Sequence, residues 1–146
     1  MIQVLILDRQ ALARDALGSL LSDARDLCVT DDTQDAGQIA ETADPHAVDV
    51  VVVDQSTLAE ASGAIAQLKR SRPALRTLVL ANSADPEVAM AILRTGIDGY
   101  VTKNDDRLTL LTAIRRLASG GRYVCPVVGW RIAMSVLHVD AETVIH

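Results

Sequence analysis

The chain has 146 residues, of which 49% are hydrophobic, and its formal net charge is −5. This length suits one compact domain, and the negative charge argues against a nucleic-acid-binding surface, because phosphate contacts depend on clustered Lys and Arg. No apolar stretch approaches the roughly 20 residues that span a bilayer, and no signal peptide begins the chain, so we expect a cytoplasmic protein without a membrane segment.

Short apolar runs alternate with longer segments of helical period along the chain. This alternation of expected strands and helices predicts a doubly wound α/β fold with a five-stranded parallel sheet and helices on both faces. The five expected strands are Ile2–Leu7, Leu27–Thr30, Val48–Val53, Thr77–Leu80 and Tyr100–Thr102.

The first expected helix runs from about Ala11 to Asp23, with Arg14 on its outer, polar side. Another helix, near Leu58–Arg70, ends before Pro73. The inward stripe of the first helix comprises Leu12, Ala16, Leu17, Leu20 and Leu21.

The next helix begins with Asp85 as its cap and Pro86 in its first turn, and it stops at Gly96. A further helix covers Asp106–Ser119. Its spacing turns four residues inward: Leu108, Leu111, Ile114 and Leu117.

The last segment, Val127–Leu137, predicts a short additional helix in which Trp130 is a packing or dimer anchor. We therefore divide the chain into a main domain, residues 1–124, and a C-terminal helix or linker segment, residues 125–146.

Two carboxylates follow apolar runs at the ends of expected strands. Asp8 follows Val4–Leu7, and Asp54 follows Val50–Val53. In a parallel sheet, ligands and chemistry collect in the crevice outside the carboxyl ends of the strands. The functional site should therefore be built around these two acids.

The cysteines and histidines do not suggest a metal site. Cys28 and Cys125 lie far apart, and His46, His138 and His146 are scattered. No cluster has the spacing of zinc ligands, so we expect two reduced thiols and no histidine-based metal site.

Two segments carry a family resemblance. Ala91–Lys103 (AILRTGIDGYVTK) and Ala113–Tyr123 (AIRRLASGGRY) combine glycine, aromatic and lysine positions at a fixed distance from a strand-end aspartate. They resemble the receiver domain of bacterial two-component response regulators, in its NarL/FixJ (LuxR-type) subfamily, and the similarity covers residues 2 to about 133. This resemblance implies the CheY-like strand order 2-1-3-4-5.

The resemblance also implies roles for individual residues. Asp54 would take a phosphoryl group from a kinase phosphohistidine, with Asp8 as the acid of the metal site and the Ser56 carbonyl as a metal ligand. Lys103 would pair with the phosphoryl group, and Tyr100 would be the aromatic whose rotamer reports activation. A carboxylate nucleophile of this kind needs cations to neutralise the transferred group.

Two positions depart from the family pattern. Arg9 stands where the family has a second acid, and Ala81 stands where it has a Ser or Thr that bonds the phosphoryl oxygen. Asp8 and Asp54 are then balanced by Arg9 and Lys103. We expect Arg9 to contact Asp54 and replace the metal as internal counterion, so that no cofactor is bound; the alternative is Mg²⁺ held by Asp8, Asp54 and the Ser56 carbonyl.

These residues predict a non-enzymatic, atypical receiver that regulates a partner or an attached transcription-factor output, with metal-dependent phosphorylation of Asp54 impaired by Arg9 and Ala81. One alternative is a conventional receiver phosphorylated at Asp54, the regulatory half of a LuxR-type DNA-binding regulator. A distant alternative is a flavodoxin-like cofactor-binding protein or enzyme, although the residues after the first strand, Asp8–Leu12, contain no glycine for a phosphate cradle.

The expected partners are a second copy of the chain and a sensor histidine kinase or other signalling protein. We expect no membrane contact, no direct binding of nucleic acid and no helix-turn-helix domain in this segment, which is either part of a longer regulator or a receiver that works alone. The dimer surface is expected on the first and fifth helices or on the fourth and fifth, where the candidates are Ile92, Leu111, Arg115 and Arg116.

Overall fold

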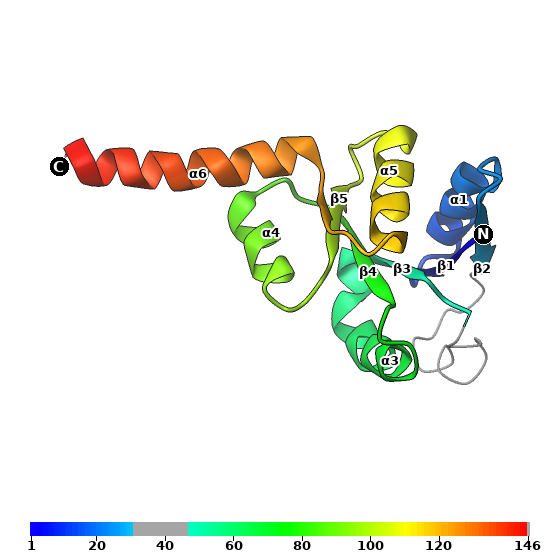
Figure 1. The fold of residues 1–146 in the computed structure, drawn as a ribbon. Coiled ribbons are helices and arrows are strands. Elements are labelled where there is room, and N and C mark those ends of the chain that lie inside the picture. Colours follow the sequence, from blue (N-terminus) through cyan, green and yellow to red (C-terminus); the bar gives the residue numbers. More distant parts are fainter. Residues whose placement is uncertain (31–46, 146) are drawn as a thin grey trace.

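The computed structural model describes residues 1–30 and 47–145, with the side chains of the last helix described as far as His138. Within these residues, six parallel strands form one sheet in the order β2-β1-β3-β4-β5-β6. Figure 1 shows α1 and α5 on one side of this sheet and α3 on the other. The strands are β1 Ile2–Leu7, β2 Leu27–Thr30, β3 Val50–Asp54, β4 Arg76–Ala81, β5 Gly99–Thr102 and β6 Tyr123–Val124.

The doubly wound fold and the order of the first five strands are confirmed, but the expected number of strands was one too low. The additional strand, β6, has two residues and pairs with β5. Two backbone hydrogen bonds hold it there, since Tyr123 N–H donates to Asp98 O at 3.2 Å and Cys125 N–H donates to Tyr100 O at 3.0 Å. Two residues are too few to produce a recognisable strand pattern. The helix expected between β2 and β3 lies outside the described residues.

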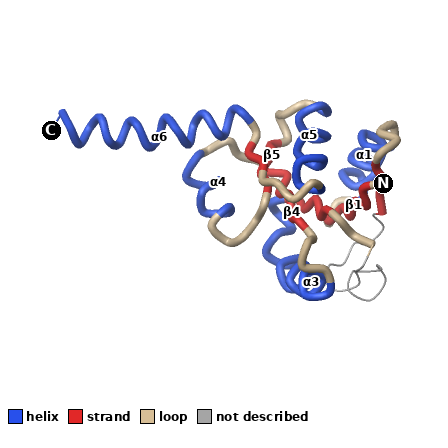
Figure 2. Tube along the Cα trace, viewed as in Figure 1, coloured by secondary structure: helices blue, strands red, loops and turns tan. Residues whose placement is uncertain are grey.

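The helices of the described residues follow the strands in alternation, and a short 3₁₀ helix, Gln55–Thr57, links β3 to α3. The strands lie at the centre of the molecule in Figure 2, with the helices around them. The helices are α1 Ala11–Ser22, α3 Leu58–Ser71, α4 Pro86–Leu93, α5 Arg107–Ala118 and α6 Pro126–Ile145.

The centre of the sheet explains the unbroken valine run of the sequence. Residues 50–53 in β3 are fully buried, because the strand has neighbours on both edges and helices over its faces. A strand buried on both faces reads as a continuous apolar run and not as an alternating one. The run ends at Asp54, where the strand reaches the edge of the sheet.

The predicted inward stripe of α1 was correct at Leu17 and Leu21 but wrong at its other three positions, Leu12, Ala16 and Leu20. Leu12 is 84% exposed and Leu20 is also exposed, whereas Arg14 is buried. The face toward the sheet runs through Arg14, Leu17 and Leu21, which have helical spacing of three and four positions. The sequence did not predict this face, because Arg14 is charged and charged residues were expected on the exposed side of the helix.

In α5 the prediction was correct for three of its four positions. Leu111, Ile114 and Leu117 are buried, but Leu108 is 66% exposed. The buried stripe passes through Leu110 in place of Leu108. Asp106 caps the helix by accepting a hydrogen bond from Thr109 N–H at 2.8 Å.

The start of α4 is confirmed. The Asp85 carboxylate accepts a hydrogen bond from Glu87 N–H at 2.9 Å, and Pro86 occupies the first turn. The helix ends at Leu93, and the chain then turns through Gly96, whose φ of +99° is strained for any residue with a side chain.

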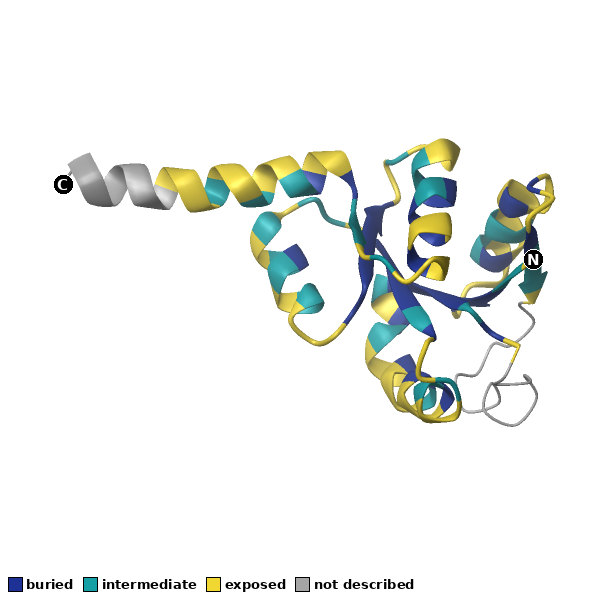
Figure 3. Ribbon diagram, in the orientation of Figure 1, coloured by how far each residue is buried: buried dark blue, intermediate teal, exposed yellow. Residues whose placement is uncertain are grey.

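The last helix, α6, is longer than predicted and extends away from the sheet (Figure 1). Its first turns pack beside α4, with Val128 buried and Ile132 half-buried. Figure 3 shows that much of its remaining described surface is exposed. Within the described residues, none of the helices combines the length and hydrophobicity required to cross a bilayer.

Candidate functional site

The predicted site residues come together at the carboxyl edge of the sheet. Asp8 follows β1 and Asp54 ends the neighbouring β3, since Leu7 and Val53 are paired in register. On the other side, Ala81 at the end of β4 pairs with Thr102 of β5, and Lys103 follows directly. Each of these four strands, β1, β3, β4 and β5, therefore places a predicted site residue at the same edge.

Both carboxylate oxygens of Asp54 have close partners. The ammonium Nζ of Lys103 lies 2.5 Å from Oδ1, so these two residues form an ion pair. The other oxygen, Oδ2, accepts hydrogen bonds from Ser56 N–H at 3.0 Å and from the Ser56 hydroxyl. The carboxylate itself is only 4% exposed.

These partners keep Asp54 ionised despite its burial. Burial alone would raise the pKa of this carboxyl, but Lys103 and Ser56 outweigh it, and the pKa lies below its usual value. The site thus holds a buried, charged carboxylate beside a partly exposed cation.

Asp8 is held in place by a different set of contacts. Its Oδ1 accepts a hydrogen bond from Gln10 N–H at 2.8 Å. Its backbone carbonyl accepts one from Nη1 of Arg14 at 2.7 Å. The sequence interpretation missed Arg14 as a site residue, although its spacing to Leu17 and Leu21 was a signal that could have located it.

Arg9 does not form its expected contact with Asp54. Among the described residues, its guanidinium pairs with Glu60 Oε1 at 2.7 Å and donates from Nη2 to the Ser56 carbonyl at 3.4 Å. The oxygens of Asp54 are already engaged by Lys103 and Ser56, while the Glu60 carboxylate is exposed and free to meet an exposed guanidinium. Arg9 thus contacts the carbonyl that the family resemblance assigned to the metal, and not the acid.

The two expected switch positions lie on adjacent strands. Ala81 is fully buried and has no polar side-chain atom. Tyr100 is also fully buried, and its hydroxyl donates to the Ser83 carbonyl at 2.6 Å. Burial raises the pKa of Tyr100, with smaller contributions from Cys125 and Asp85. The Tyr100 side chain is therefore hydrogen-bonded to the loop between β4 and α4.

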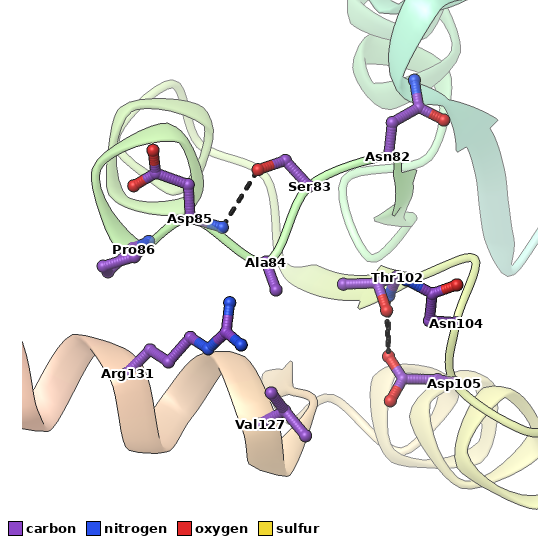
Figure 4. A pocket seen from close by; sticks show the side chains of 10 residues that line it. All are labelled: Asn82, Ser83, Ala84, Asp85, Pro86, Thr102, Asn104, Asp105, Val127 and Arg131. Carbon is purple, nitrogen blue, oxygen red and sulfur yellow. Dashed lines mark hydrogen bonds between the residues drawn. The ribbon is translucent and has the colours of Figure 1, made fainter.

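The same loop lines an open cleft of about 690 Å³ that the sequence did not suggest. Its other walls are the loop after β5 and the first turns of α6, which supply Val127 and Arg131 (Figure 4). In Figure 4 the Arg131 side chain extends from α6 toward the loop that carries Asp85. The base of α6 therefore adjoins the loop that Tyr100 contacts.

No group of three or more His, Cys, Asp or Glu side chains that could hold a metal ion occurs within the described part of the chain. The charged side chains at this edge have a formal sum of zero, because Asp8, Asp54 and Glu60 are matched by Arg9, Arg14 and Lys103. The arrangement can stabilise added negative charge through Lys103, and it has fewer free oxygen donors than a pocket of three acids.

Comparison with known proteins places this geometry in a family. The family model of the response regulator receiver domain matches residues 4–115. The oxygen regulatory protein NreC of Staphylococcus haemolyticus is 31% identical over 124 residues, which are 84% of this chain and 57% of that protein. The transcriptional regulatory protein DegU of Brevibacillus brevis is 29% identical over 129 residues, 87% of this chain and 54% of that protein. The chain thus spans a little over half the length of these curated relatives.

Solved structures support the same fold. A LuxR-family two-component response regulator from Aurantimonas sp. SI85-9A1 superposes with a TM-score of 0.79 at 23% identity, covering 92% of this chain and 97% of that one. A LuxR-family DNA-binding response regulator from Silicibacter pomeroyi has a TM-score of 0.66 at 26% identity, with coverages of 86% and 98%. The chain belongs to the response regulator receiver domains of two-component systems, in their NarL/FixJ, LuxR-type branch.

Proposed function

We propose that this receiver is an atypical one, in which Arg9 occupies the Ser56 carbonyl that a metal ion would use and metal-dependent phosphorylation is impaired. The observation that carries the proposal is the contact between the Arg9 guanidinium and the Ser56 carbonyl. In the family pattern that carbonyl binds the metal, so a metal ion and this guanidinium would compete for one oxygen.

The donor set does not fit Mg²⁺ well. Mg²⁺ requires near-octahedral oxygen ligands at about 2.0 to 2.1 Å and gives up its water reluctantly. Of the three donors that the resemblance implies, Asp54 is paired with Lys103 and the Ser56 carbonyl accepts from Arg9, which leaves Asp8. A pocket whose charges already cancel offers a dication little attraction. We therefore propose no resident cofactor.

Ala81 would weaken the response further. A hydroxyl at this position would donate to a phosphoryl oxygen, and a hydrogen bond to a charged group contributes about 1.5 to 3 kcal/mol. The buried methyl group of Ala81 offers no such bond. Even if Asp54 accepted a phosphoryl group, its coupling to the loop that Tyr100 contacts would be reduced.

We propose that the domain, residues 1–124, acts as a non-enzymatic regulatory module in the cytoplasm, with residues 125–146 as its C-terminal segment. It would regulate a partner or an attached transcriptional output, without direct contact to nucleic acid by this segment. The relatives named as regulatory proteins, NreC and DegU, support the regulatory role. The second candidate is a conventional receiver phosphorylated at Asp54, and the ionised carboxylate beside Lys103 favours it.

The exposed leucines of α1 and α5 are the proposed docking surface for a kinase or other signalling partner. Leu12 and Leu108 lie in the first turns of these neighbouring helices, which begin at the site's edge of the sheet. A partner that reaches Asp54 must approach this edge. Of the two surfaces expected for a homodimer, the one on α4 and α5 is the less suitable, because Leu111 is buried and Arg115 pairs with Asp26 at 2.8 Å.

The test compares Mg²⁺ binding by the wild type and by Arg9→Asp, with calorimetric titration in the absence and presence of beryllofluoride, an aspartyl-phosphate mimic. We expect Mg²⁺ to bind the variant at least about tenfold more tightly, because one charge reversal restores the second acid. Arg70→Asp, which makes the same charge change at an exposed position of α3, should behave as the wild type.

Equal and tight Mg²⁺ binding by the wild type and Arg9→Asp would overturn the proposal in favour of the conventional receiver. A gain in Arg70→Asp equal to that in Arg9→Asp would also overturn it, because the effect would then come from net charge and not from the site.

A further inference from the structure

The exposed side of α6 carries an apolar stripe that nothing in the described part of the chain covers. Trp130 is 64% exposed and Leu137 is 56% exposed. Val127 and Met134 are exposed on the same helix. Large apolar side chains gathered on one exposed face mark an interaction site more often than scattered ones do.

The spacing of this stripe is that of a coiled coil. Val127, Trp130, Met134 and Leu137 are separated by three, four and three positions, and the sequence continues the pattern with four positions to Ala141 and three to Val144. Apolar residues at alternating intervals of three and four occupy the a and d positions of a heptad repeat, which form a seam along one side of a helix. We call the four described residues, Val127, Trp130, Met134 and Leu137, the α6 seam.

Trp130 and Leu137 of the α6 seam face away from the rest of the domain, whereas Val127 also lines the cleft beside the loop between β4 and α4. The residues of α6 that pack toward α4 are Val128 and Ile132. At 100° per residue, the direction midway between Val128 and Ile132 is roughly opposite to Trp130 and Leu137. A second helix can therefore approach the seam without meeting α4, and Figure 1 shows α6 extending clear of the sheet.

We propose that the α6 seam binds the α6 seam of a second copy of this chain. A heptad seam is complementary to another seam of the same period, and two copies satisfy this requirement without any further partner. The sequence does not oppose it, because none of the charged residues of α6, Arg131, Asp140 and Glu142, occupies a heptad position of the apolar pattern. This pairing does not depend on phosphorylation of Asp54.

A membrane surface fits the same helix less well. Helices that lie on anionic bilayers carry several Lys or Arg residues on their polar face. In α6 the single arginine is outnumbered by Asp140 and Glu142. Lipid binding is therefore an alternative outcome of the test and not the expected one.

The heptad pattern in the sequence, from Val127 to Val144, covers only about two and a half heptads, so we expect association that depends on concentration. The chain provides its own probe, because Trp130 is the only tryptophan and lies within the seam. Pairing should move its fluorescence emission to shorter wavelength and protect it from iodide quenching.

The experiment measures sedimentation equilibrium and Trp130 emission of the full chain from about 1 to 500 μM, a range that spans weak to moderate dimers. We expect a dimer whose dissociation constant rises at least about tenfold in Leu137→Glu, because a charge would be buried in the seam. Val136→Glu is the matched control, since Val136 is 51% exposed on the same helix but lies outside the seam. Circular dichroism reports whether each variant keeps its helices.

Several results would overturn the inference: a wild type that stays monomeric over the whole range, equal weakening by Val136→Glu and Leu137→Glu, or a dimer lost in Leu108→Glu but retained in Leu137→Glu. Binding of monomers to anionic vesicles, with loss of that binding in Leu137→Glu, would assign the seam to a membrane. None of these results bears on Mg²⁺ binding by Arg9→Asp, so the two proposals fail separately.

Discussion

Two arginines close to Asp8 contact backbone carbonyls in opposite surroundings. Arg14 is buried and donates to the Asp8 carbonyl at 2.7 Å on the inner side of the site. Arg9 is exposed and reaches the Ser56 carbonyl at 3.4 Å on the outer side, where it also pairs with Glu60. The inner cation has one arrangement imposed by packing, whereas the outer one is free to exchange partners with solvent.

The difference shows that charge alone does not decide what a cation contributes to this edge. On the inner side, removal of a partner leaves a polar group without water, and the loss is large. On the outer side, water replaces the lost partner. The unusual residue of the site, Arg9, is therefore a candidate for function more than for stability.

Arg14→Met should have the largest effect on stability, because it removes the buried cation on the inner side of the site. The substitution keeps most of the apolar stem but removes the donor to the Asp8 carbonyl, and we expect a loss of about 2 kcal/mol in the free energy of unfolding. Urea denaturation at neutral pH measures it. Arg25→Met, at an exposed position beyond α1, is the control; an equal loss there would remove the distinction between inner and outer cations.

Lys103→Met should have an intermediate effect, because Lys103 is half-exposed but its partner Asp54 is buried. At pH 7 we expect a loss of about 1 kcal/mol, below the 3 to 5 kcal/mol found for fully buried pairs because solvent screens the ammonium.

The loss in Lys103→Met should depend on pH. The lowered pKa of Asp54 stabilises the wild type above the unfolded-state pKa of about 3.9, and this contribution disappears as pH falls through the lower folded-state pKa. Without Lys103, burial is less opposed and the carboxyl pKa rises. The difference between the two proteins should therefore shrink as pH falls from 7 toward 3, and a difference that does not change with pH would contradict the pairing.

Arg9→Ala should have the smallest effect on stability, because it removes the exposed cation on the outer side of the site. Exposed ion pairs contribute about 0.2 to 1 kcal/mol, so we expect the free energy of unfolding to change by no more than about 0.5 kcal/mol. The same urea experiments measure it, with Glu60→Ala as the matched variant. A loss as large as that in Arg14→Met would mean that Arg9 is held inside the site.

Much of the fold followed from the sequence because its signals are local. The valine run of β3 predicted a strand buried on both faces, and Asp85 followed by Pro86 predicted the start of α4. The family pattern brought Asp54 and Lys103 together correctly. Each of these inferences depends on adjacent residues or on a motif of fixed spacing.

The failures arose where a long side chain or a distant partner decides the outcome. Arg14 lies on the buried face of α1 because its guanidinium can reach the Asp8 carbonyl, and this bond is invisible in a pattern of hydrophobic residues. Arg9 turns to Glu60, which is distant in sequence, because Lys103 and Ser56 already occupy the oxygens of Asp54. Which carboxylate a cation contacts depends on the other cations and donors near it in the folded structure, and the sequence alone does not show these.

The short strand β6 also affects how the sheet ends. Without it, β5 would present its four residues as an open edge, with unpaired amides and carbonyls available to a strand of another molecule. The two residues of β6 cover part of that edge and are themselves too few to template an intermolecular sheet. On this side of the molecule, β6 thus protects the domain against aggregation.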